Sequence, residues 1–463
     1  MSKYAQVFGQ YLDLCRQVEG RRRAAAPLIA RLNKAGADAL GRIAETYRPD
    51  PMAVPQTRPD SLFAPDYGVN LLRVDLPVNA SEAFRCGVPN LNSYVGIVGN
   101  DSFHPTGSLQ SLPEGLTVCS LADVPECLEE KVINRLIHIV DNSVETGDPS
   151  EALNALLLSD GILIHAAAGV KVDKAVQIVN ISNPATPMLA PRRVVVIAEE
   201  DSELKVLLCD HSQAPTVEHL SLECVNVEAA KGSKIEIYDI EEGQLTSRRA
   251  WRLNARQAER STLSVATAFL QGGISGNGFR VECTGDYTQT SLSGLAICGC
   301  GQVVDNSVTL VHKGVHGTSH QNFKTALYDD ARGGFGGKIV VAPGAMFTDA
   351  HQSNKNLIIG DDARMNTAPQ LEIYCDEVKC SHGATTGSLD DRAMFYMQSR
   401  GIPADEARRM LTQSFMSDVI DAISFEVLRQ RMHVLVEKRL SGAAASCDTC
   451  ATACGNQSLN TEL

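Results

Sequence analysis

Cys380 and His382 stand two residues apart, and their types and spacing suggest metal chemistry. In an extended segment, side chains at positions i and i+2 point to the same face, so the thiol and the imidazole would project together. Both are soft or borderline ligands that suit iron or zinc. Two ligands do not complete a metal site, so the others would come from elsewhere in the chain or from another chain. The alternative is a small buried cysteine beside a hydrogen-bonded surface histidine.

A second group of thiols lies further along the chain, where Cys447, Cys450 and Cys454 form a C-x2-C-x3-C pattern. Three thiolates at this spacing could bind zinc or three corners of an iron–sulfur cluster, with the fourth ligand missing. They could instead relay sulfur or metal to a partner, or have no binding role. Residues 442–463 are rich in Ala, Ser, Thr, Cys and Gly, which predicts a flexible tail.

Other clusters are interpreted as structural. The pairs Cys298/Cys300 and Cys209/His211 could each share a strand face, but small buried cysteines are commoner than ligands in such strands. The segment Gly333–Lys338 (GGFGGK) lacks the G-x4-G-K-[ST] spacing of a phosphate loop, with isoleucine following the lysine. We therefore expect no nucleotide hydrolysis by this chain.

Longer motifs surround the first pair of candidate ligands. They are Asn354–Gly360 (NKNLIIG), Pro369–Tyr374 (PQLEIY), Asp376–Thr385 (DEVKCSHGAT) and Arg400–Ile402 (RGI), with further matches at Asp305–Asn306, Lys324–Thr325, Asp349 and Val88–Leu91. Together they resemble the SufD family of the SUF iron–sulfur cluster assembly system, over residues 80–440. The resemblance implies a right-handed parallel β-helix and a scaffold function without catalysis.

The resemblance also implies partners and ligands. A SufB-like scaffold would pair with the end of the β-helix, and a SufC-like ABC ATPase, which would hydrolyse ATP, would dock on the C-terminal helices. A transient iron–sulfur cluster shared with SufB would form at the interface, with His382 as a ligand and Cys380 as an accessory ligand. SufB carries a cysteine and a glutamate where this chain has Ala363 and Gly383. The partner would therefore supply the thiolate and the carboxylate, while nothing carries over to the cysteine tail.

The elements that position these residues follow from periodicity. From about residue 160 apolar and polar residues alternate in short runs, as in Leu220–Cys224 and Leu263–Phe269, which predicts strands separated by glycine-rich turns. Glycines 294, 317, 337, 360 and 383 recur every 20 to 23 residues, which suggests the repeat of one coil. We therefore expect a mainly β protein with a solenoid core, and the alternative is a jelly roll or sandwich of similar strands.

Four regions are expected along the 463 residues: a mainly helical N-terminal region (1–158), the β-helix core (159–387), a C-terminal helical segment (388–441) and the cysteine tail (442–463). Within the first region, residues 70–76 resemble a strand. Ser388 is the expected N-cap of the first C-terminal helix, Gly401 its end, and Pro403 the start of the next helix.

Composition narrows the function classes. The net charge of −13 disfavours nucleic acid as a partner, and no run is apolar enough to span a membrane. Fourteen cysteines without a secretory signal predict reduced thiols and a cytoplasmic location. Two alternatives to the scaffold remain: a β-helix enzyme acting on polysaccharide, and a purely structural homodimer joined through exposed strand edges.

Overall fold

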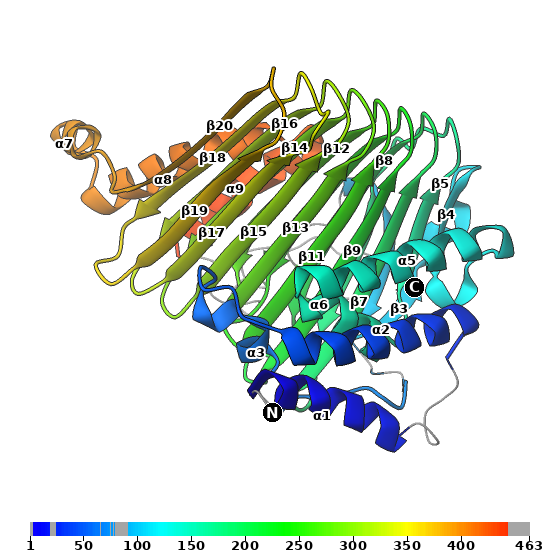
Figure 1. Cartoon of the computed structure of the whole chain (residues 1–463). Helices are drawn as coiled ribbons and strands as arrows, with labels where there is room; N and C mark the ends of the chain where they lie inside the picture. Colours follow the sequence, from blue (N-terminus) through cyan, green and yellow to red (C-terminus); the bar gives the residue numbers. More distant parts are fainter. Residues whose placement is uncertain are drawn as a thin grey trace.

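The computed structural model describes residues 3–18, 25–64, 66–74, 76, 78 and 91–442. At its centre the chain alternates between two ten-stranded sheets and adds one strand to each sheet per coil (Figure 1). The strand order is β19-β17-β15-β13-β11-β9-β7-β5-β4 in the first sheet, where β1 also pairs with β7, and β20-β18-β16-β14-β12-β10-β8-β6-β2-β3 in the second sheet. Every pairing between successive coils is parallel, which confirms the expected β-solenoid and rules out the antiparallel sandwich.

The strands have these bounds. The first sheet contains β1 (Gly68–Val69), β4 (Leu116–Ser120), β5 (Ile162–Ala166), β7 (Met188–Ala198), β9 (His219–Ala229), β11 (Ser247–Gln257), β13 (Ile274–Cys283), β15 (Val303–His312), β17 (Arg332–Val341) and β19 (Arg364–Ile373). The second sheet contains β2 (Tyr94–Gly99), β3 (Ser102–Pro105), β6 (Val176–Ser182), β8 (Glu203–Ser212), β10 (Lys234–Glu242), β12 (Thr262–Gln271), β14 (Gln289–Cys298), β16 (Thr318–Leu327), β18 (Asp349–Ile358) and β20 (Lys379–Gly387).

The coil is longer than the glycine spacing predicted. Successive strands of the second sheet begin at residues 203, 234, 262, 289, 318, 349 and 379, so one coil takes 27 to 31 residues. The predicted interval of 20 to 23 residues is wrong because the five glycines occupy unlike places: Gly294 and Gly337 lie within strands, whereas Gly317 and Gly360 lie in turns.

The space between the two sheets is an apolar core with an aromatic centre. Alternate residues of each strand enter it, such as Val225 and Val227 of β9 and Ile235 and Ile237 of β10. The rings of Trp251, Phe279, Phe323 and Phe335 contact one another in sequence along this core in edge-to-face or tilted arrangements, with centroids 5.1 to 5.6 Å apart.

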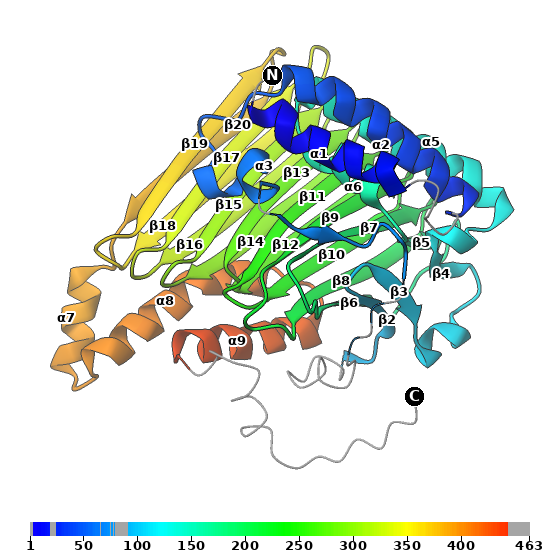
Figure 2. The same ribbon diagram turned by 90° about the horizontal axis from the view of Figure 1, so that it is seen from below.

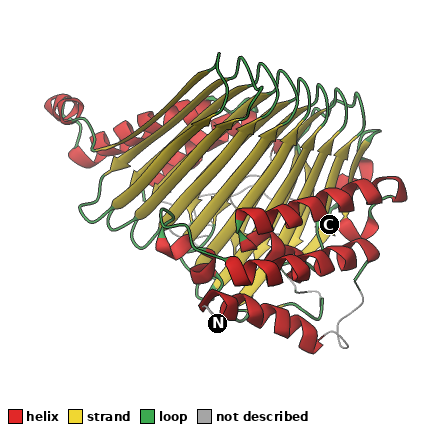
Figure 3. Ribbon diagram, in the orientation of Figure 1, coloured by secondary structure: helices red, strands yellow, loops and turns green. Residues whose placement is uncertain are grey.

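Helices cover the outer faces of both sheets on opposite sides of the solenoid (Figure 3). On the first sheet lie α1 (Lys3–Val18), α2 (Pro27–Thr46), α3 (Pro59–Leu62), α5 (Glu126–Thr146) and α6 (Pro149–Leu157), with 3-10 turns at Pro55–Thr57, Gly107–Ser111 and Leu121–Asp123 elsewhere in this region. Leu220 and Leu222 of β9 pack against these helices, so both faces of this strand are buried.

The second sheet is covered by α8 (Ala404–Asp421) and α9 (Glu426–Leu440), while α7 (Asp391–Ser399) projects beyond β20 (Figure 2). Lys324 of β16 ties α8 to the sheet: its buried Nζ donates to the carbonyl oxygen of Phe415 at 2.7 Å and pairs with Asp418 at 2.6 Å. The side-chain amine therefore satisfies two acceptors under the helix.

Two local predictions are wrong. Residues 70–74 form a turn where residues 70–76 were expected to form a strand, because the side chain of Asn70 hydrogen-bonds both the carbonyl and the amide of Val74, and Arg73 has a φ of 55°. The N-cap of α7 is Asp390, whose carboxylate accepts from the amide of Arg392, and not Ser388. Within the described residues, no helix combines the length and apolarity that a membrane crossing requires.

Candidate functional site

The two ends of the solenoid are built differently, and the candidate ligands lie at one of them. At the closed end, which comprises β2, β3 and β4, antiparallel strands β3 and β4 terminate the two sheets. At the open end, which comprises β19 and β20 (residues 364–387), the last parallel strands have no further neighbour in the described chain. Inner strands such as β8 are almost wholly buried, whereas most residues of β20 are exposed.

His382 lies on the side of β20 that faces the interior. Its register partner on β18 is Gln352, a buried residue whose side chain donates to Gln321 on β16 at 2.7 Å. Gln321, Gln352 and His382 therefore occupy the same row of three successive coils. His382 is nevertheless solvent-exposed, because no further coil of the described chain covers this row. An exposed imidazole that continues an interior row is available to a group placed against the open end.

Cys380 shares this face but is half-buried. It packs with Ala350, its register partner, and with Ile339 and Val341 of β17. Burial raises the pKa of the Cys380 thiol, and Asp349 adds to the effect. The thiol is thus held in its protonated form, whereas a metal ligand must be a thiolate. The geometry favours packing for Cys380 unless a bound metal displaces the proton.

Sequence reasoning missed a third residue in this cluster. Cys375, in the turn between β19 and β20, is half-buried and packs in the same cluster as Cys380. Cys375 and Cys380 form a C-x4-C spacing in the sequence. Their proximity in space could not be predicted, because the length of the turn between the two strands was unknown. The tail residues Cys447, Cys450 and Cys454 lie outside the described part of the chain.

The outer face of β20 carries a separate polar group. The Ser381 hydroxyl lies 2.6 Å from Nδ1 of His351, and Asp349 lies 2.6 Å from Nε2 of the same ring. His320 stacks on His351 with ring centroids 5.5 Å apart. These histidines belong to the face opposite His382, so they and His382 do not share a site.

The residues interpreted as structural fall into the body of the solenoid. Cys298 is fully buried at the end of β14, whereas Cys300 is exposed in the following turn, so the two thiols do not converge. Cys209 and His211 are both buried on β8. Gly333–Lys338 lies within β17 and forms no loop, which agrees with the rejection of a phosphate loop.

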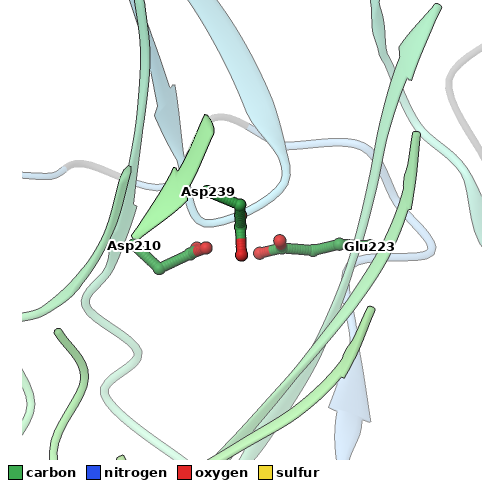
Figure 4. A group of neighbouring side chains, drawn as sticks. All are labelled: Asp210, Glu223 and Asp239. Atoms are coloured by element: carbon green, nitrogen blue, oxygen red, sulfur yellow. The ribbon is translucent and has the colours of Figure 1, made fainter. Parts of the chain in front are cut away.

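Among the described residues, three potential metal-ligand atoms lie within 4.8 Å of one another at a single place, formed by Asp210, Glu223 and Asp239 (Figure 4). All three carboxylates are buried between the two sheets. Two arginines fill the space among them. Arg249 Nη2 lies 2.6 Å from Asp239, 2.8 Å from Glu223 and 2.9 Å from Asp210, and Arg192 Nη1 lies 3.0 Å from Glu223.

This group is therefore an ion-pair network and not a metal site. Burial raises the pKa of Asp210 well above its ordinary value. Burial also opposes ionisation of Glu223, but Arg249 and Arg192 outweigh it and lower the pKa of that carboxyl. Burial and the arginines thus shift the pKa values of two neighbouring carboxyls in opposite directions. Since this network is the one group of three potential ligands among the described residues, His382 and Cys380 have no third ligand there. A metal site at His382 would need ligands from a partner.

The C-terminal helices expose apolar side chains. None of the residues of α7 is buried, and Phe395 and Tyr396 are 73% and 59% exposed. Other large exposed apolar residues on α8 and α9 are Met410, Val427 and Val434. Phe395 and Tyr396 are adjacent on α7, and exposed aromatic rings of this kind are candidates for contact with another protein.

Comparison with known proteins places the chain in a family. The family model for the SufBD core domain of the SUF system of iron–sulfur cluster assembly matches residues 180–415, and the model for the SufBD N-terminal region matches residues 10–178. These two matches together span both the helical N-terminal part and most of the solenoid.

Individual relatives agree with this assignment. The iron–sulfur cluster assembly protein SufD of Escherichia coli is 36% identical over 187 residues, which cover 40% of this chain and 44% of that protein. A SufBD family protein of Synechocystis is 26% identical over 388 residues, covering 79% of this chain and 82% of that protein. SufD of Bacillus subtilis is 24% identical over 295 residues, covering 62% and 66%. The chain belongs to the SufBD family of iron–sulfur cluster assembly proteins of the SUF system.

Proposed function

We propose that this chain is a non-catalytic scaffold subunit that pairs with a SufB-like chain through the open end and contributes His382 to a nascent iron–sulfur cluster. A SufC-like ATPase would bind the C-terminal helices and hydrolyse ATP, and the complex would act in the cytoplasm. The observation that carries the proposal is the edge strand β20, which presents an exposed imidazole in an interior row.

The backbone chemistry of the open end supports the proposed pairing. Edge strands β19 and β20 present main-chain amides and carbonyls without a neighbour in the described chain, which favours addition of a strand from another chain. A SufB-like solenoid would continue both sheets. A second copy of this chain could occupy the same edges, so a homodimer is the expected competitor when the chain is purified alone.

The cluster is the cargo of this interface and His382 one of its ligands. Neutral imidazole binds iron, and it would lie on the face that the partner covers. Cys380 would serve as an accessory ligand only if metal displaced its proton, since burial raises its pKa. The positions Ala363 and Gly383 carry no ligand atom, so the partner would supply a thiolate and a carboxylate.

The docking of an ATPase on the helices is supported by their exposed apolar side chains and their attachment to the second sheet. Phe395 and Tyr396 on α7 would enter the partner surface. The Lys324 contacts to Phe415 and Asp418 would carry movement of α8 to β16, which lies two strands from the open edge.

The test is co-expression with SufB and SufC from the same source, followed by anaerobic purification and measurement of iron, labile sulfide and visible absorption. His382→Ala is expected to lower cluster content several-fold without loss of the complex. His320→Ala, an exposed histidine on the opposite face, is the matched control and is expected to leave cluster content unchanged.

Two outcomes would contradict the assignment. If His382→Ala assembles clusters as the wild type does, His382 is not a ligand. If truncation after Gly442 removes the cluster while His382→Ala does not, the thiols Cys447, Cys450 and Cys454 are the working ligands.

A further inference from the structure

A cavity of about 310 Å³ lies on the outer face of the first sheet, away from the open end. Its floor is formed by β11, β13 and β15, and its walls by residues 47–59 and by the corner between α5 and α6. In Figure 1, α3 lies at one side of these strands, and α5 and α6 lie at the other, where α6 contacts β11. The volume is at the lower end of the range for small-molecule sites.

The wall formed by residues 47–59 is fixed to the sheet. The amide of Val54 and the hydroxyl of Thr57 both donate to Oδ2 of the buried Asp305 at 2.8 Å. Gly334 allows this close approach, because a Cβ there would lie 2.4 Å from Oδ1 of Asp305. The cavity is therefore held open by specific contacts and is not a gap beside a loose loop.

The opposite wall is fixed through Arg252. Its Nε donates to Asp148 at 2.6 Å, and its Nη1 donates to the carbonyl oxygen of Gly276 at 2.9 Å. Gly278 is required for this position, since a Cβ there would lie 2.7 Å from Cδ of Arg252. Asp148 also caps α6 by accepting from the amide of Ser150. The ion pair between Arg252 and Asp148 thus joins β11 to the start of α6 at this wall of the cavity.

Among the charged groups lining the cavity, the buried or half-buried carboxylates already have partners. Asp148 pairs with Arg252, Asp305 accepts from the 47–59 segment, and Glu151 pairs with Arg193 at 2.9 Å and accepts from Asn254 at 2.6 Å. The fourth carboxylate, Asp50, is exposed and accepts from the amide of Met52.

Two arginines in the lining lack a carboxylate partner. Arg48 donates to backbone carbonyls, including that of Tyr47 at 2.7 Å, and Arg58 donates to the carbonyl of Pro51 at 3.2 Å. Within the described chain, neither guanidinium has a carboxylate oxygen within 4.0 Å, and Nε of Arg58 is shielded from solvent without an acceptor. The charged groups of the lining that can still form hydrogen bonds to a ligand are therefore the donors Arg48 and Arg58.

We propose that this cavity binds a small molecule carrying a phosphate or carboxylate group, with Arg58 and Arg48 as the anion ligands. Guanidinium groups bind both anions by charge-assisted and often bidentate hydrogen bonds. The cavity is larger than a single anion requires, so the remainder of the ligand would lie over the strands, near the hydroxyls of Ser307 and Thr309. This inference is independent of the cluster ligand at the open end.

The test is titration calorimetry of the full chain with inorganic pyrophosphate and with citrate, at constant ionic strength. Saturable binding with a Kd below about 1 mM is expected for at least one probe, and the probe that binds identifies the anion class. Arg58→Gln is expected to weaken binding at least tenfold. Arg48→Gln, at an exposed position, is expected to weaken binding by less.

The matched control is Arg42→Gln, because Arg42 is an exposed arginine that pairs with Asp141 and does not line the cavity. It is expected to bind as the wild type does. Absence of saturable binding for both probes would overturn the proposal, as would wild-type affinity in both Arg58→Gln and Arg48→Gln. Equal weakening in Arg42→Gln would also overturn it, since the effect would then reflect overall charge.

Discussion

The closed and open ends of the solenoid differ in the direction of their outermost strands. Each end of a stacked sheet leaves main-chain groups without a neighbour. At the closed end the chain turns back on itself, and the antiparallel strands β3 and β4 stop the stack. At the open end β19 and β20 keep the parallel register of the coils before them and leave their side chains exposed.

The difference decides which end of the solenoid a further parallel coil could extend. An antiparallel strand cannot be followed by another coil of the same solenoid, because the direction of the sheet is reversed there. A parallel edge can be followed by a further coil, including one from another chain. The contrast therefore lies in the outermost strands and not in the interior, where apolar side chains and the ion-pair network of Arg249 fill the space between the sheets.

The largest effect on stability is expected for the substitution of an interior arginine, compared with an arginine at the open end. Arg249→Met in the interior would leave Asp210, Glu223 and Asp239 without their shared cation, and we expect a loss of about 3–5 kcal/mol in the free energy of unfolding. Arg364→Met on β19 removes hydrogen bonds to the carbonyls of Asp361 and Ala363 alone, and we expect less than about 1 kcal/mol. Urea unfolding measures both, and equal losses would contradict the contrast between interior and open end.

A second prediction tests whether the interior excludes water and protons equally in the half near the closed end and in the half near the open end. His219 on β9 and His312 on β15 are buried, and burial lowers the pKa of each to about 4. The unfolded state then binds more protons between pH 6.5 and 4, so stability falls as the pH falls through this window. From pH 7.5 to 5 we expect a loss of about 2 kcal/mol for each histidine.

The measurement is urea unfolding at both pH values for the wild type, His219→Gln and His312→Gln. Each substitution should remove its own share of the pH dependence. Glu241, whose pKa burial raises to about 7, acts in the opposite direction, so the difference between variants is the relevant quantity. If His312→Gln left the pH dependence unchanged, the interior towards the open end would admit water and protons, unlike the closed half.

The smallest effect on stability is expected for a substitution at the open edge of β20. The amide of Lys379 donates to Thr348 beside β18, so the amides of alternate residues of β20 point to β18 and that of Ala384 points away. Ala384→Pro removes a donor from the free edge alone, and we expect a change of less than about 1 kcal/mol in unfolding free energy. Association with a SufB-like chain, measured by co-purification, should fall at least tenfold.

Thr385→Pro is the control, because that amide faces β18 and its loss breaks an internal hydrogen bond. It should lower the stability of the isolated chain more than Ala384→Pro does. Association that survives Ala384→Pro would mean that the partner does not extend the second sheet.

Much of the fold could be predicted from the sequence, because the strands obey a period of two and motifs around residues 354–385 resemble one family. Details set by side-chain chemistry at single positions could not be predicted. Asn70 folds its own segment into a turn, and Asp390 caps α7 in place of Ser388. The coil length was also missed, because glycine serves strand interiors as well as turns.

The site could be predicted in part. Alternation along β20 places Cys380 and His382 on one face, but their unequal exposure depends on which coil is last. The Asp210, Glu223 and Arg249 network was missed, since charged residues in strands are usually interpreted as solvent-facing. The arginines of the cavity were missed for a related reason: Arg48 and Arg58 flank a proline-rich loop whose contact with Asp305 spans about 250 residues.

The interior ion-pair network has a consequence for how the chain folds. Successive coils are similar in length and apolar pattern, so a strand could pair with the wrong coil and still bury its side chains. Such a shift would bring Arg249 among apolar residues and leave its carboxylate partners without a cation, at a cost of several kcal/mol. The charges thereby distinguish the native order of coils from a shifted one, and they penalise misfolded pairings that a uniformly apolar interior would tolerate.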